Sequence, residues 1–303
     1  MAPVLLIGPF IMANALATLP VRPSWDVACL GPYKVLGTIA EGGMGIVLRG
    51  QDVRTGAMVA IKTVRSQRKC DETCLRREIS VLGRLSHPGI VPVIDNGTSG
   101  GAPWMAMELL EGETVDDLIT ALWPKRVPYP AAAAAGNLPE VVGIVAQLCR
   151  ALEYLHARGL VHRDVKPANV FVGDDGQVTL LDFGLVCAAH GAANDVNAAD
   201  LCVGTMEYAA PEQIRGEPVD ARADIYSVGC VLYELISGRR LADADDAIGW
   251  GPLAPSDLVA RVPARLETLL LSMLAERRDE RPSSAGAIAD VLEEIAWRPA
   301  EAA

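Results

Sequence analysis

Two short polar motifs constrain this chain more than any other part of its sequence. The first is HRDVKPAN at residues 162–169, and the second is DFG at residues 182–184. Residues 170–181 between them contain two β-forming stretches around a GDDG turn, which predicts a hairpin. Asn169 and Asp182 stand at the two ends of that hairpin. The fold must therefore bring together an acid, a cation, a carboxamide and a second acid, which are Asp164, Lys166, Asn169 and Asp182.

These residue types can hold a metal-bound nucleotide and a hydroxyl side by side, which is the equipment of phosphoryl transfer. The two motifs resemble the catalytic and metal-binding loops of the eukaryotic-type (Hanks-type) bacterial serine/threonine protein kinases, and Lys166 points to the serine/threonine branch. The resemblance implies that Asp164 is the catalytic base and that Lys166 neutralises charge on the transferred phosphoryl group. It also implies ATP and Mg²⁺ as cofactors, with Asn169 and Asp182 as the metal ligands.

A glycine-rich segment near the start of the chain resembles the nucleotide loop of that family. Residues 39–47 match the GxGxxGxV pattern, except that Ala40 stands where the first glycine belongs. Glycines let backbone amides approach phosphate oxygens, and Gly42 and Gly45 keep this property, so we expect Ala40 to tune affinity rather than abolish binding. The nucleotide-contacting residues implied by the match are Ile39, Ala40, Glu41, Gly42, Gly43, Met44, Gly45 and Val47.

Two further segments complete the expected nucleotide site. The apolar strand VAIK at 59–62 ends in Lys62, which the resemblance assigns to the α- and β-phosphates. Glu78 takes the place of the helix-C glutamate that pairs with this lysine; the alternative is one more solvated helix charge. Residues 105–112 resemble the hinge between lobes. The implied adenine-site residues are Ala60, the gatekeeper Met107, and the backbones of Glu108 and Leu110.

The resemblance continues through the second half of the chain. In GTMEY at 204–208, Thr205 is expected to hydrogen-bond the catalytic loop, which is another mark of the serine/threonine branch. Asp224 is expected to brace the backbone of that loop, and Glu212 is expected to pair with Arg281 in the core. Both of these roles are structural.

The segment after DFG departs from the usual pattern. No Ser, Thr or Tyr stands between Leu185 and Val203, so the phosphorylated residue that would pair with Arg163 is missing. We hypothesise that Asp195 or Asp200 acts as a permanent anion in its place. The alternative is that a partner protein orders the segment.

Composition excludes some classes of function. A formal net charge of −11 argues against a nucleic-acid partner or an anionic membrane surface, because both reward clustered Lys and Arg. The seven cysteines form no CxxC pair, which favours buried thiols in a reducing cytoplasm. A redox clasp between Cys187 and Cys202 is the alternative.

One apolar stretch needs a separate explanation. Residues 3–19 are shorter than the roughly 20 residues of a membrane helix, are interrupted by Gly8 and Pro9, and lack the basic flank of a secretory signal. No other segment reaches membrane length. We therefore expect no membrane span and a cytoplasmic location, where ATP is available.

We predict an α+β, two-lobed protein-kinase fold with a small β-rich N-lobe that carries helix C and a large, mainly helical C-lobe. The expected divisions are a poorly ordered extension at 1–32, a kinase domain at 33–296 and a tail at 297–303. Residues 123–139, rich in proline and alanine, indicate a surface insertion. Within the kinase domain we expect an N-lobe at about 33–107, a hinge at about 108–112 and a C-lobe at about 113–296.

The predicted function is transfer of the γ-phosphoryl group of ATP to a Ser or Thr hydroxyl of a protein substrate. Because the sequence contains no recognisable sensor segment, we expect a separate regulatory protein. The alternatives are a pseudokinase scaffold, which binds nucleotide or a partner without catalysis, and a small-molecule phosphotransferase. Ala40 and the missing loop hydroxyls support the pseudokinase, whereas the peptide platform of GTMEY and APE argues against a small-molecule substrate.

Overall fold

The computed structural model describes most of the chain outside its two ends. The described residues are 29–42, 45–65, 69–123, 138–184, 186–188, 206–241 and 262–297. Several sequence expectations lie outside these residues: Gly43 and Met44 of the nucleotide loop, Thr205, the anion candidates Asp195 and Asp200, Cys202, and most of the expected extension, insertion and tail.

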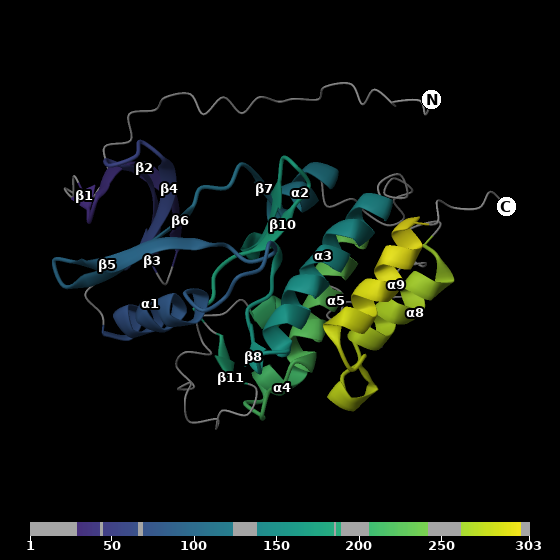
Figure 1. The fold of residues 1–303 in the computed structure, drawn as a ribbon. Coiled ribbons are helices and arrows are strands. Elements are labelled where there is room, and N and C mark those ends of the chain that lie inside the picture. Colours follow the sequence, from purple (N-terminus) through teal and green to yellow (C-terminus); the bar gives the residue numbers. More distant parts are fainter. Residues whose placement is uncertain are drawn as a thin grey trace, which may run out of the picture.

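The small lobe is an antiparallel sheet with one helix packed beside it (Figure 1). Neighbouring strands pair in the order β1-β2-β3-β4-β6-β5. The helix α1 (Lys69–Leu82) contacts β5 and β6. The strand bounds are β1 (Cys29–Leu30), β2 (Tyr33–Gly42), β3 (Gly45–Asp52), β4 (Met58–Thr63), β5 (Val93–Ser99) and β6 (Ala102–Glu108).

The central strand β4 shows why Lys62 points toward α1. Val59 and Ile61 are fully buried in a cluster with Tyr33 and Trp104 on one face of the sheet. Ala60 belongs instead to the large core that includes Leu75 of α1. Side chains alternate between the faces of a strand, so Lys62 lies on the same face as Ala60.

The large lobe is mainly helical, with short strands at its junction with the small lobe (Figure 1). Helix α3 packs against both α5 and α9, and α5 also contacts α8. The helices are α2 (Val115–Leu122), α3 (Leu138–His156), α4 (Pro211–Ile214), α5 (Arg222–Ser237), α8 (Ala264–Met273) and α9 (Ala285–Trp297). The strands are β7 (Gly112–Thr114), β8 (Leu160–Val161), β9 (Val170–Gly173), β10 (Val178–Leu180) and β11 (Cys187–Ala188).

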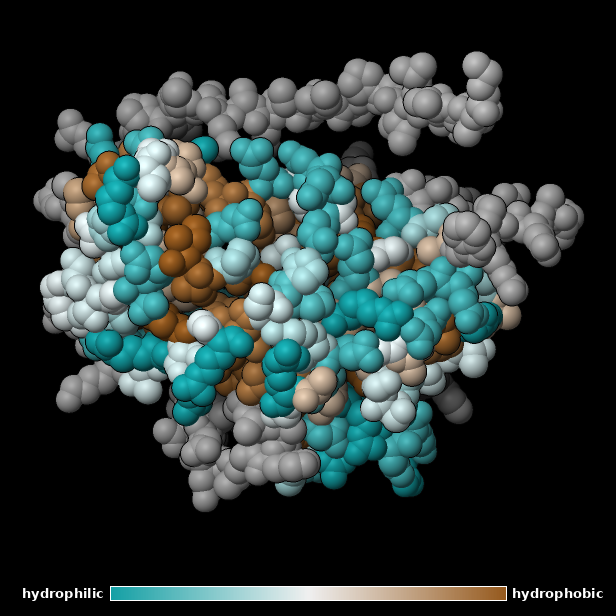
Figure 2. All heavy atoms as spheres, viewed as in Figure 1, coloured by the Kyte–Doolittle hydropathy of each residue, from teal (hydrophilic) through white to brown (hydrophobic). Residues whose placement is uncertain are grey.

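The predicted hairpin between the two polar motifs is present as β9 and β10. These strands pair antiparallel, and β7 adds to the other edge of β9. The turn closes at Gly176, where φ is +80°, a backbone conformation that glycine adopts without a steric cost. Figure 2 shows that hydrophobic side chains gather between the two lobes, whereas hydrophilic ones cover much of the large lobe.

The structure corrects two expected boundaries. Cys29 and Leu30, assigned to a poorly ordered extension, pair with β2 because Leu30 is buried against the sheet. Trp123, assigned to the insertion, is also buried, and its Nε1 donates to the carbonyl of Leu235 at 3.3 Å. Pro139 lies inside α3 rather than in the insertion. For Leu30 and Trp123, contacts with residues distant in sequence decide the boundary.

The expectation of buried thiols is correct for only part of the cysteines. Cys149 and Cys230 are buried, and burial raises the pKa of the Cys149 thiol to about 12. Cys29 and Cys70 are exposed, so the sequence expectation is wrong for these two. Within the described ranges, no helix is both long and apolar enough to cross a bilayer.

The expected core pair of Glu212 and Arg281 is present and fully enclosed. Two hydrogen bonds join the guanidinium to the carboxylate, at 2.7 and 2.8 Å. The remaining guanidinium donors reach the carbonyls of Ala275, Arg222 and Glu276. Arg281 therefore fastens the start of α4 and the start of α5 to the segment before α9.

Removal of this guanidinium is expected to destabilise the fold strongly. Arg281→Met leaves the buried Glu212 carboxylate without its cation, which costs about 3–5 kcal/mol. The free energy of unfolding, measured by urea denaturation, should fall by that amount. The control is Arg215→Met, which breaks only exposed ion pairs and should cost less than about 1 kcal/mol. Equal losses in the two variants would contradict the assigned role of Arg281.

Candidate active site

The centre of the site is a buried ammonium shared by two carboxylates. Lys62 Nζ on β4 lies 2.8 Å from both carboxylate oxygens of Glu78 on α1 and 2.9 Å from Asp182 Oδ1. Glu78 Oε1 also accepts a hydrogen bond from the backbone N–H of Phe183 at 3.1 Å. The sheet, the helix and the DFG segment are thus joined at one point.

The electrostatics of this cluster follow from its burial and its charge. Burial alone would lower the pKa of Lys62, but two contacting carboxylates raise it, so the amine is charged. Burial raises the pKa of Glu78, and the shared cation offsets this only in part. Burial also disfavours the Asp182 carboxylate, yet Lys62 outweighs it and the pKa of Asp182 lies below its ordinary value.

The catalytic-loop motif forms a second cluster on the large lobe. Lys166 Nζ donates to Asp164 Oδ2 at 2.8 Å, and Asn169 Nδ2 donates to the same oxygen at 3.0 Å. Asn169 Nδ2 also reaches the carbonyl of Asp164 at 2.9 Å. The aspartate is therefore held by a cation and an amide, and its Oδ1 accepts no hydrogen bond from the described residues.

A backbone contact joins the two clusters. The N–H of Leu181 donates to the carbonyl of Asn169 at 2.8 Å, which fixes the two ends of the β9–β10 hairpin side by side. Asp182 follows directly and has φ of +54°, an uncommon value for a residue other than glycine. The N–H of Gly184 donates to Asp182 Oδ1 at 3.2 Å, which helps to hold this conformation.

Asp224 at the start of α5 braces the catalytic loop, as the sequence predicted. It accepts hydrogen bonds from the backbone N–H groups of His162 and Arg163 at 2.9 and 2.8 Å, and it contacts His156 Nε2 at 2.8 Å. Burial would raise the pKa of Asp224, but the contact with His156 and these amides lower it. The brace matters because Arg163 has φ of +68°, and such strain persists only where surrounding contacts enforce it.

Two supporting residues received no role from the sequence. Gln213 of α4 donates from Nε2 to the carbonyl of Arg163 at 3.0 Å, which secures the strained residue from the other side. His162 is fully buried and packs edge-to-face on Phe183, with ring centroids 5.0 Å apart. Burial lowers the pKa of His162 despite nearby carboxylates, so its ring is neutral. The sequence feature that could have pointed to Gln213 is its position directly after the APE motif. For His162 it is its position as the first residue of the HRDVKPAN motif.

The predicted nucleotide residues of the small lobe lie on neighbouring strands. Val47 pairs with Lys62 across β3 and β4, and Ala60 pairs with Met107 across β4 and β6. Gly45 must be glycine, because a Cβ there would lie 2.4 Å from the backbone oxygen of Thr63. Ile39, Ala40, Glu41 and Gly42 form the end of β2 and are exposed.

The hinge offers backbone groups of defined direction. The N–H of Glu108 donates to the carbonyl of Pro92 at 3.2 Å, so this donor is already used. The expected adenine contacts at the Glu108 carbonyl and the Leu110 backbone stay a prediction. Side-chain identity contributes little to recognition by backbone groups, which explains why residue types predict the hinge contacts only weakly.

The residues expected to hold Mg²⁺ have a suitable donor set. Asn169 uses its Nδ2 toward Asp164, which leaves its amide oxygen for a cation, and Asp182 uses only Oδ1 toward Lys62. Among the described residues, no group of three or more His, Cys, Asp or Glu could form an all-protein metal cage. Two oxygen ligands fit Mg²⁺, which usually takes its remaining ligands from water and substrate phosphates.

Comparison with known proteins supports the family that these motifs suggest. The profile of the protein kinase domain family matches residues 33–293. The chain is 36% identical over 281 residues to the DNA damage-responsive serine/threonine-protein kinase RqkA of Deinococcus radiodurans, covering 89% of this chain and 40% of that protein. It is 37% identical over 275 residues to the serine/threonine-protein kinase PknL of Mycobacterium tuberculosis, covering 87% and 65% of the two chains.

A solved structure agrees with the predicted architecture. The kinase domain of Mycobacterium tuberculosis PknI matches with a TM-score of 0.66 at 29% identity, covering 88% of this chain and 97% of that chain. The predicted two-lobed protein-kinase fold is therefore confirmed. The chain spans about two fifths of the length of RqkA and of PknB from Mycolicibacterium smegmatis. Because the family profile covers most of its residues, the chain belongs to the protein kinase domain family.

Proposed function

We propose that this protein is a serine/threonine protein kinase, which transfers the γ-phosphoryl group of ATP to a Ser or Thr hydroxyl of a protein. The observation that supports this most is that two polar clusters are joined. The first consists of Lys62, Glu78 and Asp182, and the second of Asp164, Lys166 and Asn169. They meet through the hydrogen bond between Leu181 and Asn169. Turnover on a good substrate is expected at about 1–100 per second.

Asp164 is the proposed base for the substrate hydroxyl. Lys166 and Asn169 both donate to its Oδ2, which fixes the carboxylate and leaves Oδ1 to accept the hydroxyl proton. Lys166 remains next to this position and neutralises charge on the transferred group. The side chain of Asp164 is only 10% exposed, so the hydroxyl and the carboxylate meet largely away from bulk water.

Lys62 is the proposed cation for the α- and β-phosphates. The pair with Glu78 holds the ammonium on the face of β4 that also carries Ala60. When bound, Mg²⁺ would offset the negative charge of the phosphates, with Asn169 and Asp182 as its protein ligands. Because Lys62 also contacts Asp182, the phosphate-binding cation and this metal ligand have a fixed spacing before any nucleotide binds.

The pseudokinase alternative has little physical support. A scaffold without catalysis needs none of the catalytic side chains in a shared arrangement, yet the base, its lysine and both metal ligands are retained. Ala40 stands in β2 opposite Val47, so the hairpin of the nucleotide loop forms without the first glycine. We also propose that this kinase acts on protein substrates in the cytoplasm and that a separate regulatory protein is its partner.

Substitution of the base is expected to remove transfer while sparing nucleotide binding. Asp164→Asn keeps the size of the side chain but not its basicity, so label transfer from ATP with Mg²⁺ to a basic generic protein should fall about 10²–10⁴-fold. Nucleotide affinity should stay within about threefold. The control is Asp290→Asn, an exposed carboxylate on α9. Equal label with wild type and Asp164→Asn would refute the proposed enzyme.

Loss of the Glu78 carboxylate is expected to weaken catalysis through Lys62. In Glu78→Gln the ammonium keeps Asp182 as its only carboxylate partner, so kcat/KM should fall by about 10- to 100-fold. Adding Lys62→Met should lower kcat/KM further, because it also removes the proposed phosphate cation and the contact with Asp182. The double variant should still lose less than the sum of the two single losses, because both changes remove the same ion pair. Glu72→Gln on the same helix is the control. Fully additive losses in the double variant would show that the two residues act separately.

A further inference from the structure

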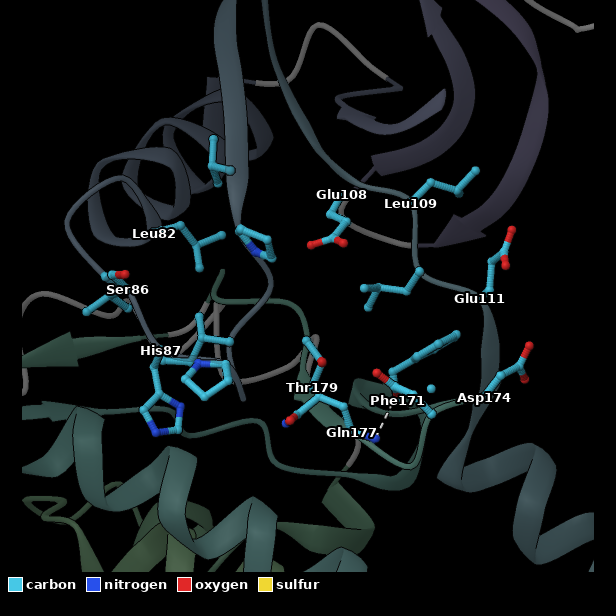
Figure 3. A pocket seen from close by; sticks show the side chains of 18 of the residues that line it. Leu82, Ser86, His87, Glu108, Leu109, Glu111, Phe171, Asp174, Gln177 and Thr179 are labelled. Carbon is cyan, nitrogen blue, oxygen red and sulfur yellow. Dashed lines mark hydrogen bonds between the residues drawn. The ribbon is translucent and has the colours of Figure 1, made fainter. Parts of the chain in front are cut away.

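A groove of about 870 Å³ lies behind the hinge, outside the proposed catalytic clusters (Figure 3). Three chain segments line it: residues 82–93 from the end of α1 to the start of β5, the hinge at 108–111, and residues 171–179 of the β9–β10 hairpin. Lys62, Ala60 and Asp182 do not line it. The groove therefore shares only the hinge and the hairpin with the proposed nucleotide site.

One end of the groove carries negative charge without compensation. Glu108, Glu111, Asp174 and Asp175 line it and are exposed, and no Lys or Arg is among the lining residues. No ion pair joins these four carboxylates to a described lysine or arginine. The neighbouring Glu113 feels this crowding, because burial and the charges of Asp117, Asp174 and Glu140 raise its pKa.

The other part of the groove is apolar. Leu82 ends α1, Leu85 and Ile90 lie in the loop after it, Val93 begins β5, and Phe171 comes from β9. Figure 3 shows Phe171 near the middle of the view, between Glu108 on the hinge and Gln177 on the hairpin. An occupant must therefore combine aliphatic and positively charged groups.

Several occupants are excluded by the charges. Anionic ligands and nucleic acids meet four carboxylates and no cation. A second copy of this chain carries its own formal charge of −11, so association at this acidic face is disfavoured. A bound metal would need a cluster of ligands, and the described residues contain no group of three or more His, Cys, Asp or Glu that could hold one.

We propose that this groove docks a peptide segment in which Lys or Arg stands beside Leu, Ile, Val or Pro, located in the protein substrate away from its phosphorylated hydroxyl. The proposal rests on the kinase function and names a class of substrate for it. The basic side chains pair with Glu111, Asp174 and Asp175, while the aliphatic side chains cover Leu85 and Val93, which are partly exposed. Docking raises the local concentration of the hydroxyl at Asp164 without altering the chemical step.

Direct binding tests the groove independently of catalysis. The probe is a fluorescein-labelled peptide with two Lys-Arg pairs around Leu-Pro-Leu and without Ser, Thr or Tyr, followed by fluorescence anisotropy. The variant Asp174→Lys with Asp175→Asn changes the charge by +3 and keeps an oxygen at residue 175 for the N–H of Gln177. The matched control, Glu217→Lys with Glu276→Gln, changes the charge equally at exposed positions of the large lobe.

The groove variant is expected to bind the probe about five- to tenfold more weakly than wild type, and the control about equally with wild type. The difference should shrink as salt rises from about 0.05 to 0.5 M, because exposed charges are screened. Equal affinity of the groove variant and wild type would overturn the proposal. Three other results would also overturn it. The first is that the control variant binds the probe as weakly as the groove variant does, and the second is that a probe with Gln in place of Lys and Arg binds as tightly as the original. The third is that a non-hydrolysable ATP analogue displaces the probe competitively.

A catalytic measurement separates this proposal from the kinase function. Fusing the docking segment to a generic Thr-containing substrate should lower KM about five- to tenfold in wild type, with kcat unchanged. The groove variant should lose that gain but phosphorylate the unfused substrate as wild type does. Transfer to neither substrate by wild type would refute the kinase function, while probe binding would still decide the groove. If the fusion lowered KM equally in wild type and in the groove variant, docking in this groove would be refuted, while the kinase function would stand.

Discussion

The structure depends on one buried cation that serves two carboxylates. An ammonium out of water is costly unless it is paired and hydrogen-bonded, and Lys62 meets this condition only when β4, α1 and the DFG segment lie in their observed places. The cluster retains a formal charge of −1, because two carboxylates share one ammonium. A divalent cation bound to phosphates would meet that charge on the side of Asp182 that Lys62 leaves free. The interaction that fixes the lobes is therefore also the one that prepares the site.

Hydrogen bonds from neighbouring segments hold the catalytic loop in a strained backbone conformation. Arg163 and Asp182 are the two described residues other than glycine with positive φ, and each belongs to one of the polar motifs. Such conformations cost on the order of 1–3 kcal/mol each and revert unless neighbours hold them. Asp224 and Gln213 hold Arg163 from opposite sides, and Gly184 holds Asp182. The helices α4 and α5 thus act on the site through backbone hydrogen bonds.

The sequence could predict those parts of the fold whose chemistry is carried by residue type. Lys62, Glu78, Asp164, Asn169 and Asp182 each stand in a motif that resembles the kinase family, so their meeting around one nucleotide was expected. The direct ion pair between Lys62 and Asp182 was not part of that expectation, because no single motif contains both residues. Burial of Leu30 and Trp123 was missed for the same reason, since each depends on partners from another part of the chain.

The groove behind the hinge could not be predicted from any motif, because it is a product of three segments that are each ordinary alone. Its position has a physical consequence for the nucleotide site. Glu108 donates its N–H to Pro92, a lining residue of the groove, and its carbonyl is one of the groups that we propose for adenine. A ligand on either side therefore contacts the same few hinge atoms. If a ligand in the groove changes the affinity of the hinge for a nucleotide, thermodynamic linkage requires the nucleotide to change the affinity of the groove for its ligand by the same factor.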